Sequence, residues 1–196
     1  MGERVPAWSQ GFTERSINNE QGVDIRPYDE RTEAIKPFTV VDGEFQDEKY
    51  FIRRLDEVRE WLRVEPLDLP DDLCIINFRG GEYVGVHDLF LTKEYWETAI
   101  DMMNEKYPNI RYEVHTDDPE TARKFFPGFP IIKDIALNWR SIRYAKHLII
   151  SNSSFAILPA ILNENVIEVI APKYWARRNI GVQSMEQNVY SKFTHV

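Results

Sequence analysis

From residue 73 onward, short apolar runs alternate with segments of helical periodicity, and this alternation is the strongest constraint on the fold. The runs predicted to be strands are Leu73 to Phe78, Ile110 to His115, Phe129 to Ile132, His147 to Ser151 and Val166 to Ala171. The helices predicted between them are Thr92 to Lys106, Pro119 to Phe126, Ile135 to Lys146 and Ser154 to Leu162. Apolar strands separated by helices are typical of a parallel sheet covered on both faces. The sequence therefore predicts a doubly wound, Rossmann-like α/β domain.

The chain before this alternation has a different character. Residues 1–37 are polar and aperiodic, and we expect an irregular lead-in there. Residues 38–70 are predicted to connect this lead-in to the main domain, with a short strand from Phe38 to Val41 and an amphipathic helix from Asp47 to Val64. The main domain itself is predicted to span residues 71–196.

Charge and cysteine content narrow the classes of partner. The 24 Lys and Arg against 32 Asp and Glu give a net charge of −8, which argues against unspecific binding to nucleic acid or to an anionic membrane. The single cysteine, Cys74, excludes a disulfide framework. With no long apolar stretch and no leader pattern, we expect a cytoplasmic protein, with peripheral membrane association left open. Nothing in the sequence indicates the oligomeric state.

Three polar clusters follow predicted strands, at the sheet edge where domains of this kind bind ligands. They are NFRGGEY (Asn77–Tyr83), HTDDPE (His115–Glu120) and SNSSF (Ser151–Phe155). Taken singly, each has a structural explanation, because glycines make tight turns and Asp or Ser caps helices. Together, on one edge of one sheet, they predict a binding site.

The first and third clusters have the chemistry of a phosphate site. Arg79 offers a forked guanidinium suited to phosphate oxygens. The helix start at Ser153, Ser154 and Phe155 offers hydroxyls, backbone N–H groups and the positive end of a helix dipole. We expect Gly80–Gly81 to let a ligand approach the backbone. These features predict a site for a nucleoside diphosphate.

The second cluster supplies two carboxylates, Asp117 and Asp118. They are acceptors suited to a ribose or a base, although Asp118 is also a good cap for the helix that Pro119 begins. Because the pair is adjacent and phosphate can be neutralised by Arg79, we expect neither a metal nor another cofactor. The G-x-G-x-x-G and G-x-x-x-x-G-K-[ST] patterns are absent, and the four scattered histidines are assigned no catalytic role.

The order of these motifs resembles the α-1,2-fucosyltransferase family of glycosyltransferases, in its carboxyl-terminal half. The family's motifs are similar to Asn77–Tyr83, Leu91–Ile100 (LTKEYWETAI), His115–Glu120, Ser151–Asn163 (SNSSFAILPAILN) and Ile170–Trp175 (IAPKYW), and its linker between lobes is similar to Gly43–Phe51 (GEFQDEKYF). The resemblance covers about residues 38 to 178. It implies one lobe, the GDP-sugar-binding lobe, of a two-lobe (GT-B-type) enzyme.

The chain also departs from the family pattern. The family's motif is H-x-R-R-G-D-Y. This chain has Asn77 in place of the motif's histidine, Gly80 in place of its second arginine and Glu82 in place of its aspartate. The Gly-Gly-Leu-Gly-Asn-Gln segment that opens the family's acceptor-binding lobe is not found in residues 1–37. This stretch is interpreted either as the remnant of such a lobe in a fragment or as part of a reduced form. The alternative to an active transferase is therefore an inactive or truncated relative that binds a GDP-sugar.

The resemblance implies transfer of a sugar, L-fucose from GDP-fucose or the sugar of another GDP-sugar, to a hydroxyl of a glycan acceptor, with inversion and without a metal. Arg79 would contact the diphosphate, and Asn77 and Gly81 would lie beside the donor. Asp117 or Asp118 would hold the ribose or guanine. The phosphate would be bound by Ser153, Ser154 and Phe155. Glu82 is a candidate general base, or a residue that orients Arg79. A fragment of a eukaryotic relative would belong in the Golgi lumen.

Overall fold

The computed structural model of the protein describes residues 16–18, 23–25, 34, 48–173 and 190–196. The chain divides into two compact units, Met1–Leu55 and Asp56–Val196. The domain boundaries predicted at residues 37 and 70 stay predictions.

In the first unit, β1 (Ser16–Asn18) pairs with β2 (Val23–Ile25) as an antiparallel two-stranded sheet. These strands lie in the stretch predicted to be irregular, so that prediction is wrong for residues 16–18 and 23–25, where runs of three residues are too short to mark a strand in the sequence. The strand predicted from Phe38 to Val41 lies outside the described residues.

The amphipathic helix predicted from Asp47 to Val64 is wrong in its extent. The described part of this segment forms two 3-10 turns, η3 (Glu48–Tyr50) and η4 (Ile52–Arg54), and then the short helix α1 (Leu55–Trp61). No residue of these three elements is buried. Most of the stability of a helix in a protein comes from tertiary packing, so helical periodicity in the sequence does not by itself set the length of the helix.

The second unit contains a six-stranded, entirely parallel sheet, which confirms the predicted Rossmann-like fold. Its strands are β3 (Leu73–Phe78), β4 (Arg111–Thr116), β5 (Ile131–Ile132), β6 (His147–Ile150), β7 (Glu168–Ala171) and β8 (Thr194–His195). The order across the sheet is β5-β4-β3-β6-β7-β8. The chain thus builds outward from β3 to one edge and then, from β6, to the other, as in dinucleotide-binding Rossmann sheets. Strand β8 was not predicted.

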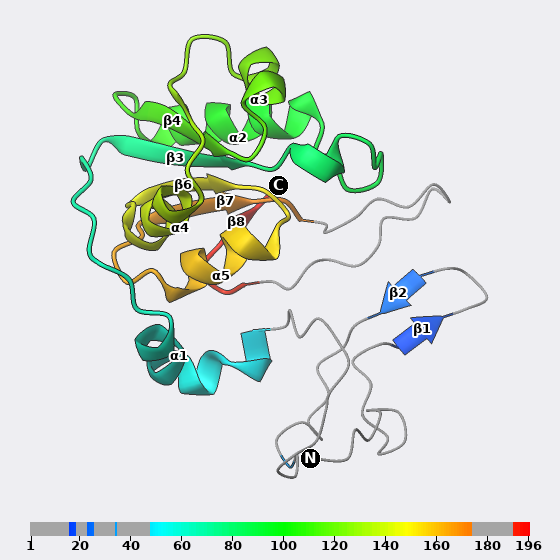
Figure 1. Ribbon diagram of the computed structural model, residues 1–196, viewed down its shortest axis with the longest axis vertical. Helices are drawn as coiled ribbons and strands as arrows, with labels where there is room; N and C mark the ends of the chain where they lie inside the picture. Colours follow the sequence, from blue (N-terminus) through cyan, green and yellow to red (C-terminus); the bar gives the residue numbers. More distant parts are fainter. Residues whose placement is uncertain (1–15, 19–22, 26–33, 35–47, 174–189) are drawn as a thin grey trace. The chain divides into compact units, whose positions relative to one another are not determined.

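Four helices of this unit cover the two faces of the sheet (Figure 1). They are α2 (Lys93–Lys106), α3 (Pro119–Phe125), α4 (Ile135–Tyr144) and α5 (Ser154–Leu162). Connections between parallel strands are right-handed, so helices change face when the chain changes direction across the sheet. The helices α2 and α3 therefore lie on one face, and α4 and α5 pack against each other on the opposite face.

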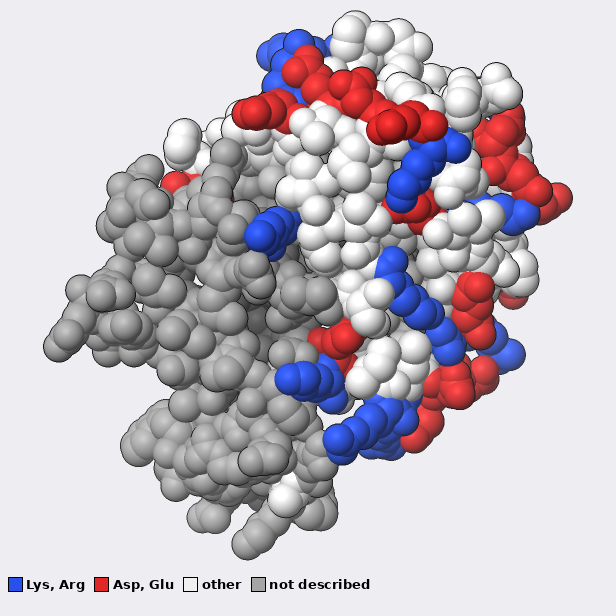
Figure 2. Space-filling view, turned by 180° about the vertical axis from the view of Figure 1, so that it is seen from behind, with Lys and Arg blue, Asp and Glu red and all other residues white. Residues whose placement is uncertain are grey.

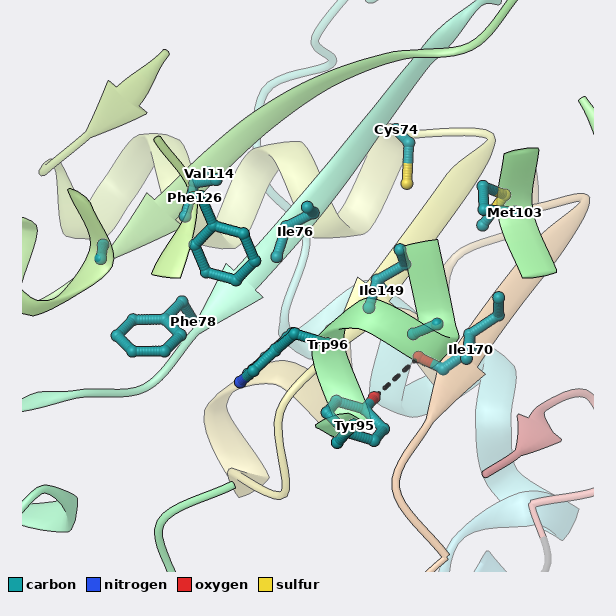
Figure 3. Packing of buried hydrophobic residues seen from close by; sticks show 12 residues of the cluster. Cys74, Ile76, Phe78, Tyr95, Trp96, Met103, Val114, Phe126, Ile149 and Ile170 are labelled. Atoms are coloured by element: carbon teal, nitrogen blue, oxygen red, sulfur yellow. Dashed lines mark hydrogen bonds between the residues drawn. The ribbon is translucent and has the colours of Figure 1, made fainter. Parts of the chain in front are cut away.

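The face under α2 and α3 holds an aromatic core (Figure 3). Phe78 of β3 contacts Trp96 of α2, with ring centroids 5.5 Å apart, and Phe126, at 5.5 Å. The Tyr95 hydroxyl donates a hydrogen bond of 2.6 Å to the Ile150 carbonyl, which satisfies the one polar atom of that side chain. Cys74 is also buried here, and burial raises the pKa of its thiol. Phe78, Tyr95, Trp96 and Phe126 all belong to one buried cluster.

On the other face, the segment before β3 is held to α4 by side chains. Residues 63–70 form no helix or strand. Arg140 donates from Nε to the Glu65 carbonyl and from Nη2 to the Pro66 carbonyl, each at 3.0 Å. The Tyr144 hydroxyl donates to the Val64 carbonyl, also at 3.0 Å. These bonds tie an irregular segment to a helix of the main sheet.

Candidate functional site

A pocket of about 360 Å³ opens at the carboxyl ends of β3 and β4, beside the point where the strand order reverses between β3 and β6. Parallel α/β sheets bind their ligands at this kind of position. Its walls come from the end of β3, the end of β4, the turn from β5 into α4 and the start of α5. The lining residues are Asn77, Phe78, Arg79, Thr116, Asp117, Lys133, Asp134, Ile135, Asn138, Ser153 and Phe155.

The pocket brings together most of the predicted site. Asn77, Arg79, Asp117, Ser153 and Phe155 all line it, although they come from three separate clusters of the sequence. The remaining predicted residues, Gly81, Glu82, Asp118 and Ser154, are not part of the lining.

Arg79 is held by two carboxylates at the mouth of β3. Its Nη2 lies 2.7 Å from Glu82 Oε1, and its Nη1 lies 2.8 Å from Asp117 Oδ2. Burial opposes the charge of Arg79, but the hydrogen bond with Glu82 and the two negative charges raise the pKa of the guanidinium. Its Nε is buried and has no hydrogen-bond partner among the described residues. The guanidinium is therefore fixed in orientation by two carboxylates while its Nε–H is left for another acceptor.

The glycines after Arg79 admit the two aspartates. Gly81 has a left-handed φ of 40°, and a side chain there would collide with Asp117 Oδ2. A Cβ at Gly80 would lie 2.6 Å from the Cβ of Asp118, and the Gly80 N–H donates to Asp117 Oδ1 at 3.0 Å. We expected the glycines to let a ligand approach the backbone, but carboxylates of this same chain occupy that space.

Asp118 acts as the cap of α3, as its position before Pro119 indicated. Its Oδ1 accepts a hydrogen bond of 3.1 Å from the Thr121 N–H. The hydrogen bond with Thr121 keeps the pKa of Asp118 below its usual value. The two adjacent carboxylates thus have different surroundings: Asp118 caps a helix, while Asp117 faces Arg79 in the pocket.

The start of α5 forms another wall of the pocket, through Ser153 and Phe155. Ser153 is the cap residue, and its side chain makes no capping hydrogen bond, so its hydroxyl is not committed to the helix. The N–H groups of a first helical turn have no partner within the helix. Ser154 is exposed and lies outside the pocket lining. Behind this wall, the Ser151 hydroxyl donates to Asn77 Oδ1 at 2.8 Å and fixes the Asn77 side chain.

The fourth side of the pocket was missed in the sequence. Lys133 and Asp134 follow β5 at the same sheet edge, so the rule that selected the other clusters would have selected them too. Asp134 caps α4 by accepting from the Leu137 N–H at 2.8 Å. Ile135, at 76% exposure, and Asn138, at 6%, complete this side. No signal in the sequence distinguishes Asn138 from any polar residue of an amphipathic helix.

The described surface shows no broad area of one charge on the face drawn in Figure 2, where acidic and basic side chains are interspersed. A continuous basic surface would be expected for unspecific nucleic-acid binding. Within the part of the chain that the structure describes, no helix has both the length and the apolar character needed to cross a membrane.

Comparison with known proteins finds one informative relative. The chain is 28% identical over 162 residues to an α-1,2-colitosyltransferase of Escherichia coli, and the match covers 69% of this chain. It covers 56% of the relative, so the chain spans little more than half of that enzyme's length. No protein-family model matches the chain, and no solved structure matches it. The similarity supports a relationship to glycosyltransferases in general.

Proposed function

We propose that this chain is the donor-binding part of a glycosyltransferase and that its pocket holds a GDP-sugar. The proposed reaction transfers the sugar, L-fucose or a close relative of it, to a hydroxyl of a glycan acceptor. The proposal rests on one observation above all: Arg79 and the start of α5 line the same pocket at the strand-order reversal. The similarity to a colitosyltransferase supports sugar transfer, and the motif resemblance supports a GDP-fucose donor.

In this proposal Arg79 and the amino end of α5 bind the diphosphate. The side chain of Glu82 is 69% exposed, so it can leave Arg79 when a phosphate oxygen takes its place. As the bond to the sugar breaks, negative charge grows on the departing diphosphate. A fixed guanidinium and a helix amino end stabilise that charge without a metal. The acceptor hydroxyl would attack from the opposite side of the sugar, which inverts its configuration.

The geometry favours Glu82 as the residue that orients Arg79 over Glu82 as the general base. Its hydrogen bond with Arg79 lowers the pKa of the carboxyl group. A lower pKa makes a weaker base, whereas general bases are effective when their pKa lies near the working pH. Glu82 also lies outside the pocket lining.

A second candidate function is binding of the GDP-sugar without turnover. Two features favour it. Gly80 stands where the resembled family has a second arginine, and the charge of Arg79 is already balanced by Glu82 and Asp117. Both candidates require donor binding, so a binding measurement cannot separate them. An assay of sugar transfer to a galactoside acceptor can, because only the first candidate predicts transfer.

The test of the proposal is calorimetric titration of the chain with GDP, UDP, ADP and NAD. We expect GDP to bind and NAD to bind at least an order of magnitude more weakly, because the site has one phosphate-binding arginine and no dinucleotide glycine motif. Addition of EDTA is expected to leave GDP affinity unchanged. Equal responses to all four ligands, or a loss with EDTA that manganese restores, would contradict the proposal.

A further inference from the structure

We propose that Asn138 of α4 is a ligand-reading residue of the pocket, whose side-chain carbonyl accepts a hydrogen bond from an N–H or O–H group of the donor. This inference rests on the proposed function and adds a specificity residue to it. Asn138 lines the pocket and is 6% exposed. Its Oδ1 is buried and has no hydrogen-bond partner among the residues that the structure describes.

An unpaired buried carbonyl oxygen is unfavourable in a folded protein, and nearly all such atoms have a partner. The backbone of Asn138 has a normal helical bond, from its N–H to the Asp134 carbonyl at 2.8 Å. The helix therefore does not need the side-chain amide. A leucine of similar shape would remove the unpaired atom and suit the helix better. What remains to explain the amide is a partner that enters the pocket.

The chemistry of Oδ1 limits that partner. A carbonyl oxygen only accepts hydrogen bonds, and the phosphate oxygens of a nucleoside diphosphate are themselves acceptors at neutral pH. The partner must then belong to the base, the ribose or the transferred sugar. Phosphate has its own donor on another wall, the guanidinium of Arg79. Asn138 would thus accept a hydrogen bond from the base or sugar of the ligand, and Arg79 would donate hydrogen bonds to its phosphates.

The same helix provides a matched control. Ser141 lies one turn further along α4, is 1% exposed, and its hydroxyl is also buried without a partner among the described residues. Unlike Asn138, Ser141 does not line the pocket. A purely structural effect of removing a buried polar group from α4 should appear at both positions. An effect on the ligand should appear only at Asn138.

The experiment compares Asn138→Leu, Asn138→Ala and Ser141→Ala with the parent chain. We expect both Asn138 variants to raise the Kd about three- to tenfold, the effect of losing one neutral hydrogen bond. Asn138→Leu is expected to keep or raise the unfolding temperature of the ligand-free protein. Ser141→Ala is expected to leave the Kd unchanged. Titration with GDP and with GDP-fucose locates the partner: a loss with both assigns it to the nucleoside, and a loss with GDP-fucose alone assigns it to the sugar.

Two results would overturn the assignment of Asn138. One is parent-like affinity of Asn138→Leu for both ligands. The other is a lower unfolding temperature of the ligand-free Asn138→Leu and Asn138→Ala proteins, which would make the residue structural. If the parent chain itself binds no nucleotide, the proposed function fails, and the ligand assigned to Asn138 fails with it.

Discussion

The two faces of the parallel sheet bury different kinds of side chain, and neighbouring residues of β3 point to each of them. On the face under α2 and α3, Phe78 packs among aromatic rings and the buried residues of the cluster are apolar. On the face under α4 and α5, the neighbouring residue Asn77 is bonded to Ser151, and Asn138 and Ser153 are buried beside a pocket. Alternate residues of a strand point to opposite faces. Asn77 therefore belongs to the site, while Phe78 anchors the aromatic core and also reaches the pocket lining.

This contrast suggests a division of labour in which stability comes mainly from the aromatic face and binding from the polar face. Buried polar groups are tolerated when they are paired or when a ligand pairs them.

Truncation of Trp96 is expected to have the largest effect. Trp96 is 2% exposed and contacts Phe78, Tyr95 and Phe126. Trp96→Ala should lower the free energy of unfolding by about 3–5 kcal/mol, as for other large buried aromatic residues. The control is Ile167→Ala, a residue 60% exposed, which should change it by less than about 0.5 kcal/mol. Urea unfolding followed by tryptophan fluorescence or circular dichroism measures both, and similar losses for both variants would contradict the division.

Loss of Arg79 is expected to act on binding and to leave the fold intact. Arg79→Ala should weaken GDP binding by about 1.5–3 kcal/mol, roughly 10- to 150-fold, because charge-assisted hydrogen bonds are lost. The GDP affinity of Arg79→Lys should lie between those of Arg79→Ala and the parent chain, because lysine keeps the charge without the forked geometry.

The control for Arg79 is an arginine at the other end of the strands. Arg111 forms a two-pronged ion pair with Asp72, at 2.8 and 2.7 Å, so Arg111→Ala removes a similar pair far from the pocket. We expect parent-like GDP affinity for that variant in calorimetry. If Arg79→Ala binds GDP as tightly as Arg111→Ala does, the phosphate-binding role of Arg79 is wrong.

The smallest expected effect comes from His147, a titratable residue with 4% exposure packed against Tyr107 with ring centroids 4.3 Å apart. Burial lowers the pKa of His147, with Lys146 acting in the same direction and Glu168 and Asp71 opposing it. The unfolded chain therefore binds a proton more readily than the folded one. Stability should be unaffected well above pH 6.5, the ordinary histidine value, and fall as the pH drops below it.

His147→Phe removes this titration and keeps an aromatic ring beside Tyr107. As the pH falls from 7 to 5, the unfolding midpoint of the parent chain should fall more than that of His147→Phe, so the midpoint of the variant rises relative to the parent. A constant difference across that range would show that His147 does not contribute to the acid sensitivity.

Most of the main domain could be predicted because its signals are local. The bounds of β3 and α5 agree with the predicted ones, since a continuous apolar run and a serine-rich helix start mark them. The cap at Asp118 followed from the proline after it. The predicted extent of α1 was wrong because periodicity alone does not fix where a helix begins and ends.

The site was predictable as a place but not as a set of contacts. Parallel strands bring their carboxyl ends together, so Arg79, Asp117 and Ser153 could be grouped from sequence. The occupation of the glycine turn by Asp117 and Asp118 depends on how two neighbouring loops interlock. Whether Asn138 Oδ1 has a hydrogen-bond partner depends on which donors lie near it in the folded chain, and none of the described residues provides one. Neither arrangement leaves a trace in residue spacing.

The attachment of residues 64–66 to α4 has an evolutionary consequence. The acceptors in all three bonds are backbone carbonyls, while the donors are the side chains of Arg140 and Tyr144. Residue identity at positions 64–66 can therefore drift without loss of the attachment, whereas exchange of Arg140 removes two of the three bonds and exchange of Tyr144 removes the third. Arg140 lies two residues after Asn138 on the same helix, so selection that preserves this tether also restrains the orientation of one wall of the pocket.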